Sequence, residues 1–438
     1  MQRFAIALVC LLSSSISSRS WAQSAPARTA TTAPPGAAPV VGAAPSASAP
    51  AGTLAPSLRE LIQLARDRAP EVLLGQFNLD VSRSSRVSAQ LAPLGNPLLE
   101  VTAQRGNRNV TRDVAINGEL WIPVEIAGQR STRKQESADY IAWHQALLAQ
   151  ARASAIGRTV RVYGSWSVGW ERLRVLRVLT ADARAEATYY GERMAAGDAT
   201  ERDAALSALE AARHDVMLVE AQSDLLQAVG VLRALTGVNV SEQQPGSMQP
   251  PLEASFRGML GERLNAGTLP ELSALAAQAR YQGSARERWA REGISPLAIG
   301  LVAGRGDLGE TRLGAGLGYA IPTFRRNQVE SSRAEAERLR ALSELELRRR
   351  VAAQRFELIA LELTELRRAV EVLTTSALPA AERAVHAAIE THRAGKGEVL
   401  PVLVSRRDLS TLSLRRLELL EKAWIRISEL VEMTGELP

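Results

Sequence analysis

The side chains that could do chemistry in this chain are few and far apart. The four histidines are His144, His214, His386 and His392. No two of them have the spacing of about four residues that places a pair of metal ligands on one helix face. The only cysteine is Cys10, and the chain contains no HExxH pair, no nucleophile elbow and no phosphate-binding loop. We therefore predict that the chain is not an enzyme and holds no metal or cofactor.

One segment matches the dinucleotide-binding fingerprint GxGxxG, at Gly304, Gly306 and Gly309. In a nucleotide-binding protein this motif ends a strand and begins a helix. Here it is followed by residues 311–320, which alternate larger and small side chains in the manner of another strand. We interpret the motif as the loop of a β-hairpin.

The charge pattern gives no support for nucleic-acid binding. The formal net charge is +6, which alone could indicate such a partner. The basic residues are nevertheless interspersed with acidic ones, as at Glu335, Glu337, Arg338 and Arg340. Aromatic residues make up 4% of the chain against 46% hydrophobic residues, a composition typical of long helices packed by small and medium side chains.

The first residues have the features of an export signal. Residues 1–22 contain an early Arg3, an apolar run and small residues before Gln23, so we predict a signal peptide that is cleaved there. Cys10 lies inside it, and the bulky Val9 makes a poor lipoprotein site. Residues 23–56 are almost entirely Ala, Pro, Ser, Thr and Gly and predict a disordered leader. Ordered structure should begin at a capping box formed by Ser57 and Glu60.

The rest of the chain contains one structural unit twice. Each of four dipeptides recurs about 200 residues later, too long a period for a solenoid repeat: Pro70-Glu71 as Pro270-Glu271, Ile122-Pro123 as Ile321-Pro322, Ala196-Gly197 as Ala394-Gly395, and Thr236-Gly237 as Thr434-Gly435. We predict a first copy at residues 57–237, a linker at 238–268 and a second copy at 269–438.

Each copy contains one predicted β-hairpin, with strands near 98–105 and 112–121 in the first and 297–304 and 311–320 in the second. Strands of this length suit a membrane span, which needs about 9–11 residues. The smallest membrane barrels have eight strands, so one chain could not close a barrel and several chains would share it. Trp121 is expected at the barrel rim, and glycines on one face of the second hairpin indicate close approach or sharp curvature.

Long helices surround these hairpins. Residues 130–194 contain no proline and residues 325–375 neither proline nor glycine, so at ~1.5 Å per residue the helices reach on the order of 80–100 Å. Glycine breaks at 197 and 395 should reverse the chain into returning helices that end at Gly237 and Gly435, as antiparallel coiled-coil hairpins. Pro379 should interrupt the second outgoing helix, and Gly157, Gly164 and Gly169 should loosen the first. The predicted fold is mainly α with membrane β.

Four segments in duplicated order resemble the outer-membrane efflux (TolC) family. Residues 120–130 and 320–326 resemble the strand exits of that family, and residues 193–199 and 392–398 resemble its helical-hairpin tips. The resemblance covers about residues 57–435. The first strand exit, from Glu125 to Arg130, is most similar to the heavy-metal branch, whose pumps are of the resistance-nodulation-division type.

The resemblance implies an assembly and a function. Three chains with four strands each would form a homotrimer with a twelve-stranded barrel in the outer membrane, and their helices would form a periplasmic α-tunnel. The trimer would be a passive exit duct for metal ions or small toxic compounds, and its partners would be outer-membrane lipid, a periplasmic membrane-fusion adaptor and an inner-membrane pump. The alternative is a periplasmic coiled-coil adaptor or scaffold without a membrane barrel.

The resemblance also indicates site residues. Candidates for adaptor docking or gating at the tips are Gly197, Asp198, Asp203, Gly395, Lys396 and Pro401, and candidates for the barrel lumen are Glu100, Gln104, Asn117 and Glu119. The family often carries acidic residues just after the second tip, where this chain has Pro401 and Val404. A gate could instead use Asp203, hydrophobic contacts, or Arg406 and Arg407.

Overall fold

The computed structural model describes residues 55–91, 95–105, 114–240, 245–246, 249–250, 267–306, 310–394 and 399–437. All of them lie in one unit of the chain, Leu54–Pro438. The predicted signal peptide and the predicted leader up to residue 54 lie outside the described residues, as does most of the predicted linker.

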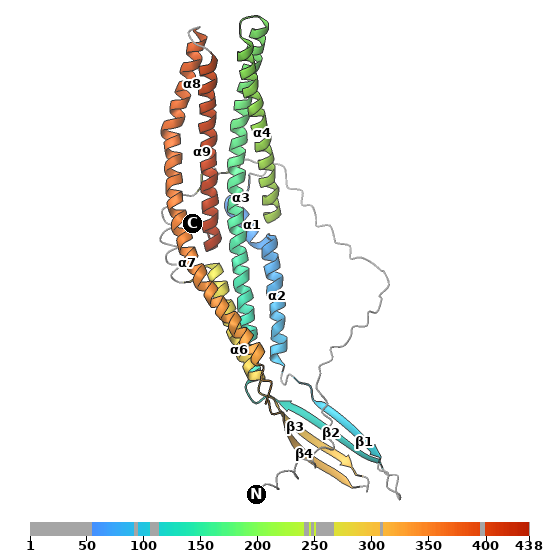
Figure 1. Ribbon diagram of the computed structural model, residues 1–438. Helices are drawn as coiled ribbons and strands as arrows, with labels where there is room; N and C mark the ends of the chain where they lie inside the picture. The colour runs from blue at the N-terminus through green and yellow to red at the C-terminus, as the bar shows by residue number, and fades with distance from the viewer. Residues whose placement is uncertain are drawn as a thin grey trace, which may run out of the picture. The chain divides into compact units, whose positions relative to one another are not determined.

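The order of elements is the same in the two copies, apart from an extra first helix in the first copy and a π-helical turn that divides the outgoing helix of the second (Figure 1). The first copy contains α1 (Leu58–Arg68), α2 (Pro70–Gln90), β1 (Leu98–Arg105), β2 (Val114–Val124), α3 (Gln129–Ala195) and α4 (Glu201–Thr236). The second contains α6 (Pro270–Glu292), β3 (Leu297–Arg305), β4 (Thr311–Tyr319), α7 (Gln328–Val372), η1 (Leu373–Ala377), α8 (Leu378–Arg393) and α9 (Val399–Thr434). The described part of the chain is thus mainly helical with one small sheet, as predicted.

Helix starts are specified locally, and the two copies use the same devices. The predicted capping box is present, because the Glu60 amide donates to Ser57 Oγ and the Ser57 amide to Glu60 Oε2. Both α2 and α6 begin with a proline, which suits the first helical position. Both long helices begin after a left-handed residue, Gly128 or Asn327. The duplication therefore extends to backbone conformation.

A second shared device follows these left-handed residues. Gln129 Oε1 accepts a hydrogen bond from the Ala127 amide at 2.9 Å, and Gln328 Oε1 accepts one from the Arg326 amide at 2.7 Å. The returning helices also end alike, at Gly237 with φ +77° and Gly435 with φ +76°. Both are predicted positions, and glycine is favoured there because it adopts positive φ without a steric cost.

Pro379 interrupts the second outgoing helix, as predicted. The helix α7 ends at Val372, a five-residue π-helical turn follows, and α8 begins at Leu378 with the proline in its first turn. Proline lacks the amide that would bond to the preceding turn, so the hydrogen-bond ladder changes its spacing just before it.

The four strands form a single antiparallel sheet in the order β1-β2-β3-β4 (Figure 1). The sequence predicts two hairpins, and the structure joins them because β2 of the first copy pairs with β3 of the second. This pairing extends β2 to Val124, beyond its predicted end at residue 121, since Ile122 pairs with Ile299 and Val124 with Leu297. Strands β1 and β4 each have one edge without a partner within the described residues.

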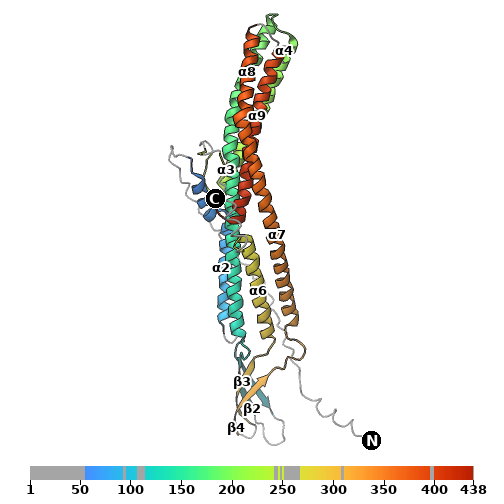
Figure 2. The same ribbon diagram turned by 90° about the vertical axis from the view of Figure 1, so that its left-hand side faces the viewer.

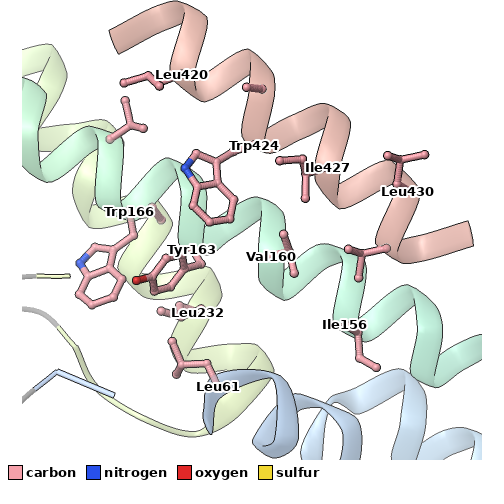
Figure 3. Packing of buried hydrophobic residues seen from close by; sticks show 14 of the residues in the cluster. Leu61, Ile156, Val160, Tyr163, Trp166, Leu232, Leu420, Trp424, Ile427 and Leu430 are labelled. Atoms are coloured by element: carbon pink, nitrogen blue, oxygen red, sulfur yellow. The ribbon is translucent and has the colours of Figure 1, made fainter. Parts of the chain in front are cut away.

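The helices pack around α3, which contacts α2 and α4 of its own copy and α6 and α9 of the other (Figure 2). In the second copy α6 and α9 pack on α7, and α8 packs on α9. The core centres on Tyr163, Trp166 and Trp424, all buried (Figure 3). No helix of the described residues is both long enough and apolar enough to cross a membrane.

The expectation that Gly157, Gly164 and Gly169 loosen α3 is wrong. All three glycines are buried in an unbroken helix that runs from Gln129 to Ala195. A Cβ atom at Gly157 would lie 2.6 Å from Cβ of Glu432, and one at Gly164 would lie 2.4 Å from Cβ of Trp424. Gly157 and Gly164 therefore let α9 approach α3 closely. Trp166, two residues after Gly164, is also buried in the core.

Candidate functional site: the two faces of the sheet and the helical tips

One face of the sheet is apolar and exposed. Its side chains come from alternate positions of all four strands, so the register brings them together: Leu99, Val101, Ile116, Ile122, Ile299, Leu301, Leu313, Leu317 and Tyr319. Leu313 is 83% exposed and Leu317 74%. A contiguous exposed apolar surface of this kind marks contact with lipid or another protein.

The opposite face is polar near β1 and β2 and rich in glycine near β3 and β4. Glu100 lies opposite Glu119 and Thr102 opposite Asn117, while Gln104 lies opposite Ala115 on the same face. The four residues predicted for the lumen, Glu100, Gln104, Asn117 and Glu119, therefore share one face of the sheet. Like charges directly opposite each other cost stability, so this face is better suited to water than to a packed core.

The structure corrects the expectation for Trp121. Its indole lies on the same face as Glu119, and its Nε1 donates a hydrogen bond to Glu119 Oε2 at 3.0 Å. The ring covers the backbone of Gly300, where a Cβ atom would lie 2.5 Å from Cε3 and Cζ3. The expected close approach at the glycines is thus made by Trp121. The aromatic residue on the apolar face near the helices is Tyr319.

The first helical tip is built by local hydrogen bonds. Gly197 has φ +82°, its amide donates to the Met194 carbonyl, and the Asp198 amide donates to the Arg193 carbonyl. This is a Schellman motif, which ends α3. The Asp203 carboxylate accepts a hydrogen bond from the Thr200 hydroxyl at 2.7 Å, at the start of α4. Asp203 therefore has a role in capping α4, and the tip presents exposed residues around Gly197 and Asp198.

The second tip is described only from α9 onward. Gly395 and Lys396 lie outside the described residues. Pro401 lies exposed in the first turn of α9, where its missing amide would have no partner within the helix. Val399 and Val402 on either side of it are buried, and Val404 is exposed.

Near the tips, the two helical hairpins are joined by two polar contacts. Arg406 Nη1 on α9 lies 2.7 Å from Glu186 Oε2 on α3. The Tyr190 hydroxyl on α3 lies 2.9 Å from His392 Nε2 on α8. These side chains line a pocket of about 390 Å³. Arg406 was among the gating alternatives, whereas Glu186 and Tyr190 were missed because their partners lie more than 200 residues away in the sequence.

The ion pair of Glu186 and Arg406 is largely withdrawn from water on the Glu186 side. Burial raises the pKa of Glu186, and the adjacent Arg406 guanidinium opposes this only in part. Burial also raises the pKa of the Tyr190 hydroxyl. Protonation of Glu186 would weaken its ion pair with Arg406. Among the described residues, no three His, Cys, Asp or Glu side chains cluster as metal ligands would.

Where the helices meet the sheet, buried charges form ion pairs within the first copy and between the two copies. Arg133 on α3 lies 2.8 Å from Glu125, and Arg288 on α6 lies 2.7 Å from Glu136 on α3. The side chains of Arg133 and Glu125 are 6% and 13% exposed. Truncating one partner of an ion pair this buried is expected to be strongly destabilising.

A four-stranded sheet with one apolar face, joined to long helical hairpins, defines the fold of the outer-membrane channels with a helical tunnel. The chain is similar in structure to a membrane protein from Pseudomonas aeruginosa, with a TM-score of 0.71 and 15% identity over 86% of this chain and 93% of that one. It is also similar to the outer-membrane channel CmeC of Campylobacter jejuni, with a TM-score of 0.67 and 14% identity over 86% and 85%.

In sequence the chain is similar to the cobalt-zinc-cadmium resistance protein CzcC of Cupriavidus metallidurans, with 28% identity over 362 residues, 79% of this chain and 82% of that protein. No protein-family model matches the chain. These similarities confirm the resemblance to the outer-membrane efflux (TolC) family, and to its heavy-metal branch, that the duplicated motifs indicated.

Proposed function

We propose that this chain is the outer-membrane exit duct of a tripartite efflux system. Three copies would close a twelve-stranded barrel in the outer membrane, and their helices would continue it as a tunnel in the periplasm. Metal ions or small toxic compounds would pass through it without energy input, while an inner-membrane pump and a periplasmic adaptor deliver them. The observation that carries this proposal is the open four-stranded sheet with an apolar exposed face.

The sheet supports the proposal because its two faces and two edges need different partners. In a bilayer, every backbone amide and carbonyl must be paired, so strands there must close into a barrel. Pairing of the free edge of β4 with β1 of another copy would provide that closure. Lipid would then cover Leu99, Leu313 and Leu317, and the polar face with Glu100 and Glu119 would enclose water. A coiled-coil adaptor without a barrel would leave the apolar face uncovered.

Equivalent positions of the two copies differ in exposure, and this difference supports an assembly of several chains. Val72 and its counterpart Leu272 are both buried, as expected for positions that pack against helices of their own copy. Phe77 is 63% exposed on α2, whereas its counterpart Ala277 on α6 is 2% exposed. The difference arises because α6 packs on both α7 and α3, whereas within the described residues α2 packs mainly on α3, with a smaller contact to α1.

The returning helices repeat this pattern. Trp424 on α9 is 1% exposed and packs on α3, whereas its counterpart Leu226 on α4 is 69% exposed. On the opposite side of the unit, α7 exposes an apolar series: Leu339, Leu347, Leu358 and Leu361. If α7 of one chain contacts α2 and α4 of the next as α3 contacts α6 and α9, the exposed apolar residues of all three helices become buried.

For the tips we propose contact with the adaptor and a role in opening. The candidates are Gly197, Asp198, Asp203 and Pro401 together with Gly395 and Lys396. The exposed Schellman turn at Gly197 supports a docking surface, and the Glu186–Arg406 contact supports a controlled separation of the two hairpins.

For the cargo we propose divalent metal ions, since the relative CzcC is named for resistance to cobalt, zinc and cadmium. The test uses a strain that lacks the gene, complemented with the wild-type chain or an empty vector. We expect lower tolerance to these three ions without the chain and restored tolerance with it. Unchanged tolerance to metals and to small toxic compounds would contradict the efflux function.

For the ends of the chain we propose an export signal at residues 1–22, a leader at 23–56 and a linker at 238–268 between the copies. The mature protein should begin at Gln23 and should require detergent for extraction from membranes. Mass spectrometry of the N-terminal peptide checks the first statement, and extraction with and without detergent checks the second. A mature protein that stays soluble without detergent would argue against a barrel.

A further inference from the structure

The loop from β4 to α7 repeats the loop from β2 to α3, but one equivalent position carries a different kind of side chain. Glu125 lies four residues before Gln129, and Phe324 lies four residues before Gln328. In both loops the glutamine side chain accepts a hydrogen bond from the amide two residues before it, and a left-handed residue lies between them. Phe324 therefore occupies the position in its loop that Glu125 occupies in the first.

Glu125 belongs to the seam where the two copies meet within the chain, which we call the inner seam. Its carboxylate lies 2.8 Å from Arg133 on α3, and the same guanidinium lies 4.0 Å from Glu292 on α6. Glu292 in turn lies 3.2 Å from Arg288. Long charged side chains therefore fill the inner seam, where those of Glu125 and Arg133 are 13% and 6% exposed.

The equivalent positions on the outer helices of the chain carry small, uncharged side chains. Ser332 on α7 is the counterpart of Arg133, and Ser88 on α2 is the counterpart of Arg288. Both serines are exposed, and Phe324 is 92% exposed. Two guanidinium side chains are thus replaced by two hydroxymethyl groups, and a carboxylate by a bulkier phenyl ring.

We propose that Phe324 closes the seam between neighbouring chains, by filling the space beside Ser332 of its own chain and Ser88 of the partner subunit. The occupant of this exposed surface is then a second copy of the chain. The inference rests on the proposed function, because it requires α7 of one chain to contact α2 of the next as α3 contacts α6.

The hydrogen bonds of the two equivalent glutamines support a missing partner at this place. Gln129 Nε2 donates across the inner seam to the Ile294 carbonyl at 2.9 Å. Gln328 Nε2 instead donates to the Phe324 carbonyl of its own loop, also at 2.9 Å. The loop from β4 to α7 therefore satisfies within itself a donor that the first loop uses to contact the other copy.

The two kinds of side chain suit the two kinds of seam. A buried carboxylate is costly unless its guanidinium partner is in place, and within one chain Glu125 and Arg133 are always present together. A phenyl ring gains free energy from burial without requiring a charged partner. An apolar contact can therefore form when separate chains meet, with no charge left buried and unpaired before assembly is complete.

The test is the temperature at which the detergent-extracted trimer dissociates, measured by size-exclusion chromatography after heating. Phe324→Ala should lower this temperature by roughly 5–10 °C, because a large buried side chain is removed. Phe324→Leu, which keeps much of the apolar area, should give a smaller fall. An unchanged dissociation temperature for Phe324→Ala would overturn the proposal.

The matched control is Ile321→Ala. Ile321 lies three residues before Phe324 and is 75% exposed, and its counterpart Ile122 remains 39% exposed beside the inner seam. The partner subunit should therefore leave position 321 uncovered, and the dissociation temperature should stay close to that of the wild type. An equal fall for Ile321→Ala and Phe324→Ala would indicate that lipid or detergent, rather than a second copy, covers both side chains.

A charge transplant tests the equivalence of the two seams. Phe324→Glu and Ser332→Arg should each lower the dissociation temperature, because each places an unpaired charge in the seam between chains. The double variant should dissociate at a higher temperature than Phe324→Glu, since it recreates the pair of Glu125 and Arg133. A double variant that dissociates no later than Phe324→Glu would contradict the proposed burial of these positions.

The wild type separates this inference from the proposed function. A wild-type protein that is monomeric in mild detergent would contradict the shared barrel itself. A wild-type trimer whose dissociation is insensitive to Phe324→Ala would contradict only the role of Phe324.

Discussion

Gly164 of α3 lies directly against Trp424 of α9, with no room for a side chain between them. A Cβ atom at position 164 would lie 2.4 Å from both Cβ and Cγ of the tryptophan. The two residues belong to different copies of the duplicated unit, and their contact lies in the core that contains Tyr163 and Trp166 (Figure 3). This close approach of backbone to indole is one of the contacts that join the two copies along their long helices.

The first prediction concerns this contact. Gly164→Ala should lower the free energy of unfolding by about 1–3 kcal/mol, since a methyl group overpacks the site. Gly191→Ala, on the same helix with open space around it, should instead raise it by about 0.5–1 kcal/mol because alanine favours helix. Thermal unfolding of the detergent-solubilised variants measures both. Equal behaviour of the two variants would show that the contact is not tight.

The second prediction concerns the buried pair of Arg133 and Glu125. Arg133→Met should lower the free energy of unfolding by about 3–5 kcal/mol, because the buried Glu125 carboxylate loses its ion pair with the Arg133 guanidinium. Adding Glu125→Gln to this variant should recover part of the loss. Arg83→Met, which breaks an exposed pair with Asp80, should cost only about 0–1 kcal/mol. Chemical unfolding of the wild type and the three variants distinguishes these outcomes. A double variant no more stable than Arg133→Met would show that the charge of Glu125 does not cause the loss of stability.

The third prediction is a pH dependence at Glu186. Burial raises the pKa of this carboxyl group above its ordinary value of about 4.5, so the folded state binds the proton more tightly than the unfolded state. Protonation should therefore increase the free energy of unfolding as the pH falls from the raised pKa toward the ordinary value. It should make no further contribution below that window.

Melting temperatures across this pH range, for wild type and Glu186→Gln, test the prediction. The variant should lack the part of the pH dependence that belongs to Glu186. Glu418→Gln, which changes an exposed glutamate of α9, serves as the control. Identical pH profiles for wild type and Glu186→Gln would refute the assignment.

The fourth prediction tests how chains meet in the proposed assembly. Tyr140 and Tyr281 contact each other across α3 and α6 with ring centroids 5.1 Å apart. Their counterparts in the other copies are Leu339 on α7 and Val81 on α2, both exposed. A chain carrying Leu339→Cys and Val81→Cys should therefore form covalent multimers with a short thiol-reactive cross-linker.

The background for this experiment is clean, because Cys10 is the only cysteine and lies in the predicted signal peptide. A ladder that ends at three chains is the expected product on a denaturing gel. Each single-cysteine variant should remain monomeric on that gel, as should the pair of Arg333→Cys with Val81→Cys, since Arg333 and its counterpart Lys134 are both exposed. Cross-linking of the control pair to the same extent would argue against the assigned contact.

Local features of the structure could be predicted from the sequence because each depends on a few neighbouring residues. The capping box at Ser57, the glycine ends of the returning helices and the interruption before Pro379 follow from backbone conformation and missing amides. The strands followed from alternation, and the duplication from recurring dipeptides. The polar face of the sheet followed as well, since alternation determines which residues share a face.

Contacts between distant segments could not be predicted in this way. Alternation places Trp121 on one face, but only the pairing of β2 with β3 shows that Gly300 lies beneath its ring. The same holds for Gly164. In the sequence this glycine predicts a less stable helix, and only the structure shows that Trp424 packs directly against it. Glu186 and Arg406 are separated by 220 residues, and no local pattern links them.

The sequence by itself therefore determined the elements of this protein and their order, because helix, strand and turn preferences act over a few residues. The tertiary structure alone decided which faces meet, since packing depends on the shape and charge of surfaces that the chain brings together from both copies. In a single chain, apolar residues of the sheet and of α2, α4 and α7 stay exposed, because the fold of one chain provides no surface to cover them.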